Sequence, residues 1–364
     1  MKIAIITFHR ALNYGAVLQA WALQTAISQL GCDVQILDYR NEWMESYSGI
    51  FNTFGKEKTV KTVLSAIRNT PIRFKRVYKY RKFIKKYLFL SKRLFQKDLH
   101  NIENHFDTFI TGSDQVWNDF LTNFDEAYFL SFVKDKEKKF SYAASFGFSE
   151  FPNKLKNEYK YRLRSFNKIS VREDRGIYLV KEACSKDATL CVDPTLLLEK
   201  SQWKSLLHSV HRKKYLLVYS LNPIVHLMDY ADFLAEKQDL QICYICNEWK
   251  NIWDYRGNKR VRHIVAPSPR DFISLINNAE YVLTNSFHGT VFSLIFHTKF
   301  YSETDYIIKK NDRINSLLSN IGLKSRIITK ELPDTKDDIN WTQVDIEIEH
   351  LKRQSLVYLK EICH

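Results

Sequence analysis

The first forty residues alternate between strand-like and helix-like patterns, and this alternation restricts the fold more than any other feature of the chain. An apolar run, "KIAIITF", precedes the helical stripe of "GAVLQAWALQTAISQLG" and a second apolar run, "DVQILDY". Gly31 stands where a glycine commonly ends a helix. Strands that are apolar throughout are typical of parallel sheets, whose strands are joined by helical crossovers. The chain therefore opens as a parallel α/β fold.

The same alternation returns in the second half of the chain. Its expected strands include "KYLLVYSL", "LQICYICN" and "YVLTNS". A chain of 364 residues is long enough for two cores. We expect two Rossmann-like, doubly wound domains with a cleft between them. Their predicted limits are 1–193 and 194–340, and a C-terminal helix follows over 341–364.

Composition narrows the class of protein. The chain is 45% hydrophobic and 26% charged, as in soluble proteins, and has no apolar run near the ~20 residues that span a bilayer. The opening "MKIAIITFHR" is too short for a secretory signal, which favours the cytoplasm. Six scattered cysteines, with "CYIC" inside an apolar run, indicate free, buried thiols. No motif predicts a metal site.

Positive charge is concentrated in residues 56–93. This segment holds fourteen Lys and Arg residues and one acid, Glu57, so it carries nearly all of the net charge of +14. Its apolar residues recur at helical spacing, which predicts a basic amphipathic helix inserted in the first domain. Three partners remain open: an anionic membrane surface, another part of the protein, and nucleic acid bound without sequence specificity. The apolar stripe consists of Phe74, Val77, Tyr78, Phe83, Ile84, Tyr87 and Leu88.

Polar turns follow four of the expected strands, at the edge of the sheets where parallel α/β folds bind ligands. Helix N-termini at this edge favour anions, and Gly15 and Gly289 would let the backbone approach a ligand. Arg172 has the fork geometry that grips a carboxylate or a phosphate. The absence of GxGxxG and GxxxxGK[ST] disfavours dinucleotide and P-loop chemistry. The four turns are residues 9–19, 111–118, 170–176 and 284–289.

A histidine interrupts the apolar stretch "YVLTNSFHGTVFSLIF". The pattern predicts a strand that ends at a polar turn and a helix that begins near Ser286. His288 would then enter the interdomain cleft. A lone histidine is more often structural than functional, but the other polar turns at the same edge favour an enzyme of anionic substrates.

Six motifs in order resemble the polysaccharide pyruvyl transferase family over about residues 1–325. They are "NYGAVLQAWALQ", "GSDQVWN", "SYAASFG", "SVREDRG", "VDPTLLL" and "TNSFHGTVFSLIF". The resemblance implies a GT-B-like arrangement and transfer of a pyruvyl group from phosphoenolpyruvate to sugar hydroxyls, with a ketal and phosphate as products. It implies an acceptor in a polysaccharide or lipid-linked precursor of a capsule or exopolysaccharide. No cofactor other than the donor is implied, and a lipid-linked acceptor would suit a peripheral enzyme at the inner face of the cell membrane.

The resemblance also implies roles for residues. His288 matches a histidine proposed as acid or base, and Asp114 is the second catalytic candidate. Ser286 stands where many members carry arginine, and Arg313, preceded by Lys309 and Lys310, is the candidate replacement. The expected donor-binding residues are Arg172, Asn285, Ser286, Gly289 and Arg313. The expected acceptor-binding residues are Asn13, Tyr14, Gly15, Gln115 and Trp117.

Two other functions stay open, because a fold does not fix a function. A GT-B glycosyltransferase using a nucleotide sugar would share the architecture and much of the cleft. A protein that binds anionic surfaces or nucleic acid through residues 56–93 would use charge alone.

Overall fold

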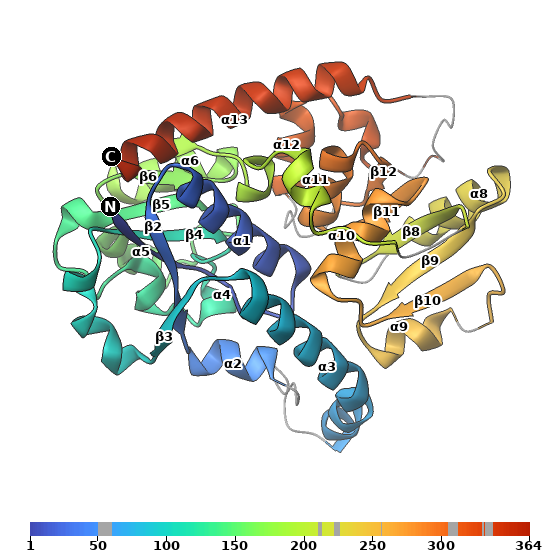
Figure 1. The fold of residues 1–364 in the computed structure, drawn as a ribbon, viewed down its shortest axis with the longest axis horizontal. Coiled ribbons are helices and arrows are strands. Elements are labelled where there is room, and N and C mark those ends of the chain that lie inside the picture. The colour runs from blue at the N-terminus through green and yellow to red at the C-terminus, as the bar shows by residue number, and fades with distance from the viewer. Residues whose placement is uncertain are drawn as a thin grey trace.

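Two parallel sheets form the framework of the protein (Figure 1). The structure is a computed structural model that describes residues 1–49, 60–209, 213–221, 226–255, 257–304, 312–329, 331 and 338–364. Within these residues the first sheet has seven strands, in the order β3 (Leu90–Leu94), β2 (Asp33–Tyr39), β1 (Lys2–Ile6), β4 (Thr108–Asp114), β5 (Lys139–Ala144), β6 (Ile169–Val171) and β7 (Ala188–Leu190). The second has five, in the order β10 (Val261–Val265), β9 (Gln241–Cys246), β8 (Tyr215–Tyr219), β11 (Tyr281–Thr284) and β12 (Lys299–Ser302).

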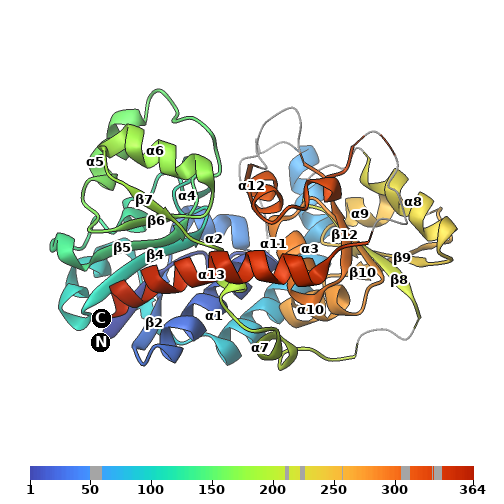
Figure 2. The ribbon, with the colours of Figure 1, turned by 90° about the horizontal axis from the view of Figure 1, so that it is seen from above.

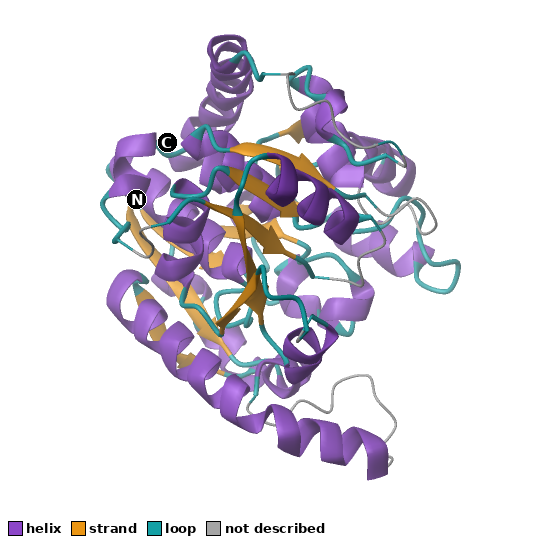
Figure 3. Cartoon of the chain, turned by 90° about the vertical axis from the view of Figure 1, so that its right-hand side faces the viewer, coloured by secondary structure: helices purple, strands orange, loops and turns teal. Residues whose placement is uncertain are grey.

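Helices flank the strands on both sides (Figure 3). Those that accompany the first sheet are α1 (Tyr14–Gln29), α2 (Glu42–Ser48), α3 (Val60–Tyr87), α4 (Asp119–Thr122), α5 (Lys156–Leu163) and α6 (Asp174–Cys184). Those that follow are α7 (Lys200–Lys204), α8 (Leu227–Lys237), α9 (Trp249–Asp254), α10 (Pro269–Asn277), α11 (Phe287–Phe296), α12 (Asp312–Asn320) and α13 (Trp341–Cys363). Short 3₁₀ helices are η1 (Gln96–Asn101), η2 (Glu103–His105), η3 (Glu126–Phe129), η4 (Lys136–Lys138), η5 (Pro194–Leu196) and η6 (Lys324–Arg326).

The central strands are buried on both faces, and β1, β8 and β11 are apolar along nearly their whole length, as is typical of buried parallel strands. In the first sheet Ile5 of β1 pairs with Ile36 on one side and Ile110 on the other. Each sheet reverses its winding direction once, between β1 and β4 and between β8 and β11. In doubly wound folds a ligand site lies outside the carboxyl ends of the strands at such a point.

Helix α1 joins the two halves of the molecule. It packs on β2 and β4 of the first sheet and also on α10 and α11 of the second half. Tyr14 stacks on Phe272 with ring centroids 4.5 Å apart, and its hydroxyl donates to Asn247 and to the Pro267 carbonyl. Because both halves share one hydrophobic cluster around α1, the halves are held in a fixed relation.

The C-terminal helix α13 runs back across both halves (Figures 1 and 2). Near its start Trp341 stacks on His297, which follows α11. Near its end the Tyr358 hydroxyl donates to the Ser141 carbonyl of β5. The chain leaves the first sheet after Leu190 and enters the second at Tyr215, so the boundary predicted at residues 193 and 194 lies within the connecting segment.

The basic segment has a different structure from the predicted insertion. Helix α3 spans Val60–Tyr87, but Leu90–Leu94 form the edge strand β3, so α3 is the crossover between two neighbouring strands. The single apolar stripe expected from the sequence is also wrong, because Phe74 and Tyr78 are exposed while Val77, Phe83, Ile84 and Leu88 are buried. The prediction missed this because both faces of the helix carry aromatic residues.

Two further predictions from the sequence concern the state of the cysteine thiols and the presence of membrane-spanning segments. All six cysteines are free and buried, which confirms the expected state of the thiols. Among the described residues, every helix is too short or too polar to cross a bilayer. The same part of the chain contains no group of three or more His, Cys, Asp or Glu residues arranged to hold a metal ion.

Candidate functional site

A cavity of about 550 Å³ opens where the carboxyl ends of both sheets face each other. Its walls come from the loops after β1, β4 and β5 on one side, and from the ends of β8 and β11 and the start of α12 on the other. Three of the four polar turns predicted from the sequence line it. The cavity therefore lies at the winding reversals of both sheets, where the fold predicts a ligand.

His288 enters this cavity from the first turn of α11. Thr284 ends β11, and Ser286 caps the helix by accepting from the Gly289 amide at 3.3 Å. The His288 ring lies against Gly15 at the start of α1, and a Cβ on Gly15 would lie 1.9 Å from its Nδ1. Its Nε2 lies 3.2 Å from Oδ2 of Asp193. His288 is thus held between the N-termini of two helices.

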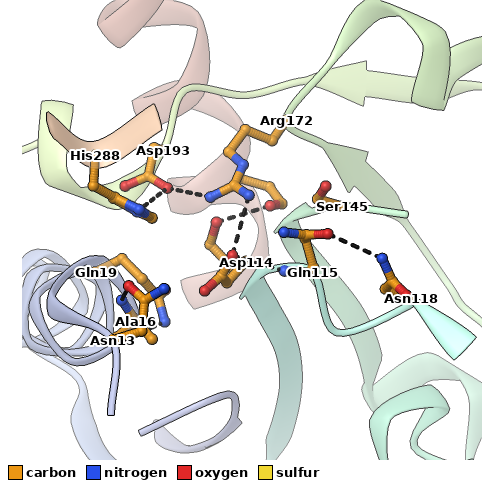
Figure 4. A network of polar contacts seen from close by, with 12 residues as sticks. Asn13, Ala16, Gln19, Asp114, Gln115, Asn118, Ser145, Arg172, Asp193 and His288 are labelled. Carbon is orange, nitrogen blue, oxygen red and sulfur yellow. Dashed lines mark hydrogen bonds and ion pairs between the residues drawn. The ribbon is translucent and has the colours of Figure 1, made fainter. Parts of the chain in front are cut away.

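Asp193 is the centre of a buried ionic chain that runs from His288 to Asp114 (Figure 4). Its Oδ2 accepts from Arg172 at 2.6 Å as well as from His288, and its Oδ1 accepts from the hydroxyl and amide of Thr195. The second Arg172 nitrogen donates to Asp114 Oδ1 at 3.2 Å. The Asp193 side chain is fully buried, so its charge depends on these partners.

The charged side chains of this buried ionic chain determine which of its members are protonated. Burial would raise the pKa of Asp193, but the His288 ring and the Arg172 guanidinium hold this pKa well below its usual value. Because Asp193 is ionised, it accepts a hydrogen bond when Nε2 of His288 carries the proton, and Nδ1 is then the ring nitrogen that is left for other contacts. Burial would lower the pKa of Arg172, but Asp193 and Asp114 raise it, so Arg172 stays charged.

A second buried carboxyl group, that of Glu173, lies next to this ionic chain. Glu173 accepts from the Ser145 hydroxyl at 2.9 Å and from the Phe146 amide at 3.1 Å. Burial raises the pKa of Glu173, although Arg172 and Arg313 oppose that rise. Its Oε2 has no hydrogen-bond partner among the described residues.

Arg313 is the guanidinium that reaches the cavity itself. It stands at the start of α12, 5.7 Å from the centroid of the Phe287 ring, and Arg172 lies 4.7 Å from the same ring. Burial and the nearby charge of Arg172 lower the pKa of Arg313 to about 10, so it is a cation near neutral pH. Its Nε has no hydrogen-bond partner within the described part of the chain. With the Gln115 side-chain amide turned so that its oxygen faces Arg313, this oxygen accepts from Nη2 of Arg313 at 3.1 Å.

The two walls of the cavity differ in charge. The wall of the second half presents His288 and Arg313, together with the N-terminus of α11. The wall of the first half presents three carboxylates and three amides: Asp114, Asp119, Glu150, Asn13, Gln115 and Asn118. Asp114 has a left-handed backbone with φ +71°, a conformation that aspartate tolerates better than most residues and that is common at functional sites. One wall therefore suits an anion, and the other suits groups that donate hydrogen bonds.

Several predicted site residues do not line the cavity. Tyr14 and Trp117 are fully buried in aromatic clusters, and the Trp117 indole donates to the Tyr128 carbonyl. The Arg172 side chain is buried outside the lining of the cavity, with its guanidinium bound by two carboxylates. Gly289 packs under Thr284, where a Cβ would lie 2.6 Å from the Thr284 hydroxyl.

The other predicted residues have definite positions. The lining includes His288, Asp114, Asn285, Ser286, Arg313, Asn13 and Gln115, and Gly15 touches His288. Asn13 caps α1 by accepting from the Ala16 amide. Asn285 accepts from the Leu221 amide at 2.8 Å. Lys309 and Lys310 lie outside the described residues.

Sequence reasoning missed Asp193 and Glu173. Asp193 belongs to the motif "VDPTLLL" and follows strand β7, so its place at a strand end was a usable signal. Glu173 adjoins Arg172 in the charged run "REDR", a composition that is typical of a solvated surface turn. Their burial depends on contacts between segments far apart in the chain, which a local pattern does not reveal.

Comparisons with known proteins now add to this geometry. The profile of the family described as polysaccharide pyruvyl transferase matches residues 13–302. No curated protein matches the sequence. Among solved structures, a Listeria monocytogenes protein described as a UDP-N-acetylglucosamine 2-epimerase has 10% identity and a TM-score of 0.51, over 99% of this chain and 90% of its own. MnaA of S. aureus, in a structure with UDP, has 12% identity and a TM-score of 0.50, over 98% and 90%. At such identities the likeness concerns the fold alone, and it confirms the GT-B-like arrangement.

Replacing Gly15 with alanine tests the placement of His288. The new Cβ would overlap the imidazole, so we expect His288 to turn away from Asp193 while the fold persists. Gly257→Ala is the matched control, because no atom lies within 4 Å of a Cβ there. Histidine ring NMR measures the change, and unaltered His288 signals in Gly15→Ala would contradict the observed packing.

Proposed function

The chain belongs to the polysaccharide pyruvyl transferase family, and from this premise we propose that it moves a pyruvyl group from phosphoenolpyruvate to hydroxyls of a sugar. The acceptor is a polysaccharide or a lipid-linked oligosaccharide precursor, and the products are a ketal and phosphate. The observation that carries this proposal is the cavity with one cationic and one carboxylate-rich wall, at the strand ends of both sheets. The anionic donor would bind the cationic wall, and the sugar acceptor, which donates hydrogen bonds, would bind the carboxylate-rich wall.

The cationic wall suits the donor. Phosphoenolpyruvate carries about three negative charges near neutral pH. Arg313 supplies a guanidinium whose Nε has no partner among the described residues, and the first turn of α11 supplies backbone N–H groups and the positive end of the helix dipole. Ser286, by capping this helix, keeps its first turn regular. These groups replace the arginine that the family resemblance leads one to expect at position 286.

The carboxylate-rich wall suits the acceptor. Sugar hydroxyls donate hydrogen bonds, and Asp114, Asp119 and Glu150 can accept them. Asp114 Oδ1 accepts hydrogen bonds from the Arg172 guanidinium and from the backbone N–H of Gln115. Its second oxygen is the candidate to orient a hydroxyl and take its proton.

The reaction requires proton transfers that this site can perform. Two C–O bonds form at C2 of phosphoenolpyruvate, the C–O bond to phosphate breaks, and the methylene carbon gains one proton and becomes a methyl group. Of the two protons released by the sugar hydroxyls, one balances the methyl group and the other leaves with phosphate. His288 exchanges a proton through Nδ1, while Asp193 holds Nε2 and fixes the ring. Arg172 keeps Asp193 in place.

Calorimetric titration with phosphoenolpyruvate tests the donor. We expect saturable binding that Arg313→Gln weakens by about ten- to a hundredfold, because a charge-assisted hydrogen bond contributes about 1.5–3 kcal/mol. Arg353→Gln, on the exposed face of α13, is the matched control. A panel of nucleotide sugars is titrated in parallel. Binding of a nucleotide sugar without phosphoenolpyruvate would favour the alternative, glycosyl transfer.

His288→Gln tests the chemistry. We expect the variant to fold and to release phosphate from phosphoenolpyruvate about 10²–10⁴-fold more slowly, the usual effect of losing a general acid or base. The acceptors are methyl hexopyranosides, whose 4- and 6-hydroxyls can bond to one carbon. His350→Gln, on the surface of α13, serves as control. Turnover within a few-fold of the unmodified protein would remove His288 from the mechanism.

We also propose that α3 brings the enzyme to the inner face of the cell membrane, where a cytoplasmic enzyme meets a lipid-linked acceptor. Val63, Ile67, Phe74 and Tyr78 are exposed, and their spacing puts them on one face of the helix. Exposed cations lie along one side of this face (Arg68, Lys75, Lys82 and Lys86) and continue it toward the C-terminal end of the helix (Arg81 and Lys85). Apolar side chains bordered by cations suit an anionic bilayer surface.

Sedimentation with vesicles tests the membrane contact. A variant with Lys82, Lys85 and Lys86 changed to glutamine should lose about 1 kcal/mol of attraction per lysine, so its partition into phosphatidylserine vesicles should fall on the order of 100-fold. Changing Lys134, Lys154 and Lys160, exposed elsewhere, removes equal charge and should have a smaller effect. Equal sedimentation of both triple variants would refute a role for α3.

A further inference from the structure

A second hollow, of about 940 Å³, opens beside the cavity at the carboxyl ends of β2 and β3. We call it the α2–α4 hollow, because helix α2 and the segment from the end of α4 to η3 form its walls. Its lining residues are Tyr39–Trp43, Ser46, Phe95–Lys97, Thr122–Glu126 and Arg162. Neither the family match nor the proposed reaction assigns it a role.

The lining of the hollow is polar and has balanced charge. Three cations, Arg40, Lys97 and Arg162, face three carboxylates, Glu42, Asp125 and Glu126. This balance gives no net attraction to a phosphate or a nucleic acid. Asp125 accepts from Tyr39 and Asn41, and Glu126 accepts from Gln96, but a carboxylate has further lone pairs that can accept from the hydroxyls of a neutral ligand.

Aromatic side chains stand among these polar groups. The lining includes Tyr39, Trp43, Phe95 and Phe124. Arg162 lies 4.2 Å from the centroid of the Phe124 ring and donates to the Phe124 carbonyl, so this part of the wall is fixed. Aromatic faces pack against the C–H faces of sugar rings, while carboxylates and amides bind the hydroxyls. The combination indicates a carbohydrate.

The hollow and the cavity share their dividing walls. On α2, Trp43 lines the hollow and the next residue, Met44, lines the cavity. On α4, Leu121 lines the cavity and Thr122 lines the hollow. The Trp43 indole donates to the Phe120 carbonyl at 3.3 Å, which ties the two walls together. A chain of sugars with one unit in the cavity would meet the hollow at the neighbouring units.

Helix α2 is anchored firmly enough to act as a wall. Glu45 accepts from Arg10 at 2.7 Å and lies 3.6 Å from Arg40, so it is tied to the loops after β1 and β2. Asn41 caps the helix by accepting from the Met44 amide, and it also donates to Asp125. A fixed wall lowers the entropic cost of binding a flexible glycan.

We propose that the α2–α4 hollow is a second carbohydrate subsite, which holds the sugar units of the acceptor next to the one that reacts. The inference rests on the proposed function, since it names the acceptor as an oligosaccharide and not a single sugar. The hollow contributes affinity for longer acceptors and takes no part in the transfer step.

Kinetics with acceptors of different length test the subsite. The probes are methyl hexopyranosides and oligosaccharides from partial hydrolysis of the surface polysaccharide of the same organism. We expect Trp43→Ala to raise KM for the oligosaccharides about tenfold, with kcat and the kinetics of the single sugar unchanged. Trp341→Ala, on α13, is the control. An equal change for long and short acceptors, or no change, would overturn the proposal.

A direct binding measurement separates this inference from the proposed reaction. Oligosaccharide binding should change the tryptophan fluorescence of the unmodified protein, and Trp43→Phe should abolish that change while Trp341→Phe keeps it. If the signal depends on Trp43 but phosphoenolpyruvate does not react, the subsite stands and the pyruvyl transfer fails. If phosphoenolpyruvate reacts but Trp43→Phe leaves the signal intact, only the subsite fails.

Discussion

The buried carboxylate of Asp193 is the interaction on which the arrangement of the site depends. It lies in the segment between the two sheets and binds Arg172, which follows a strand of the first, and His288, which follows a strand of the second. A fully buried charge is stable only when it is well paired, and removal of one member of such a pair typically costs about 3–5 kcal/mol. The energetic need to pair this charge therefore also fixes the histidine relative to the opposite wall.

Helix α1 reinforces the same geometry through packing. It is buried on nearly every side, because the second half of the chain lies where a single Rossmann-like domain would expose the helix to water. Gly15 allows the His288 ring to approach the helix closely, and Tyr14 connects the helix to α10 through its stack on Phe272. The ionic chain and this apolar contact meet at His288. A change in the relation of the two halves would disturb both.

Much of the fold followed from the sequence, because apolar periodicity is a local property. The strands around "KIAIITF" and "YVLTNS" and the helix beginning near Ser286 were predicted on that basis, and the structure contains them. The orientation of aromatic residues was not predictable in this way. Trp117 and Tyr14 stand in motifs beside the site, yet each turns into the core, since their neighbours come from distant segments. The division of α3 into a buried and an exposed face likewise depends on what packs against it.

Position 286 illustrates how charge can be relocated within a site. The family resemblance leads one to expect an arginine there, at the start of α11, but the serine instead caps the helix through the Gly289 amide. An arginine side chain does not provide this cap, so the serine gives a regular helix end, and the positive end of the helix dipole lies at the cavity wall. Arg313 approaches the Phe287 ring next to this helix end and remains charged near neutral pH. We infer that the guanidinium has moved from the strand end to α12, and that the helix dipole supplies part of the positive potential that the side chain no longer provides.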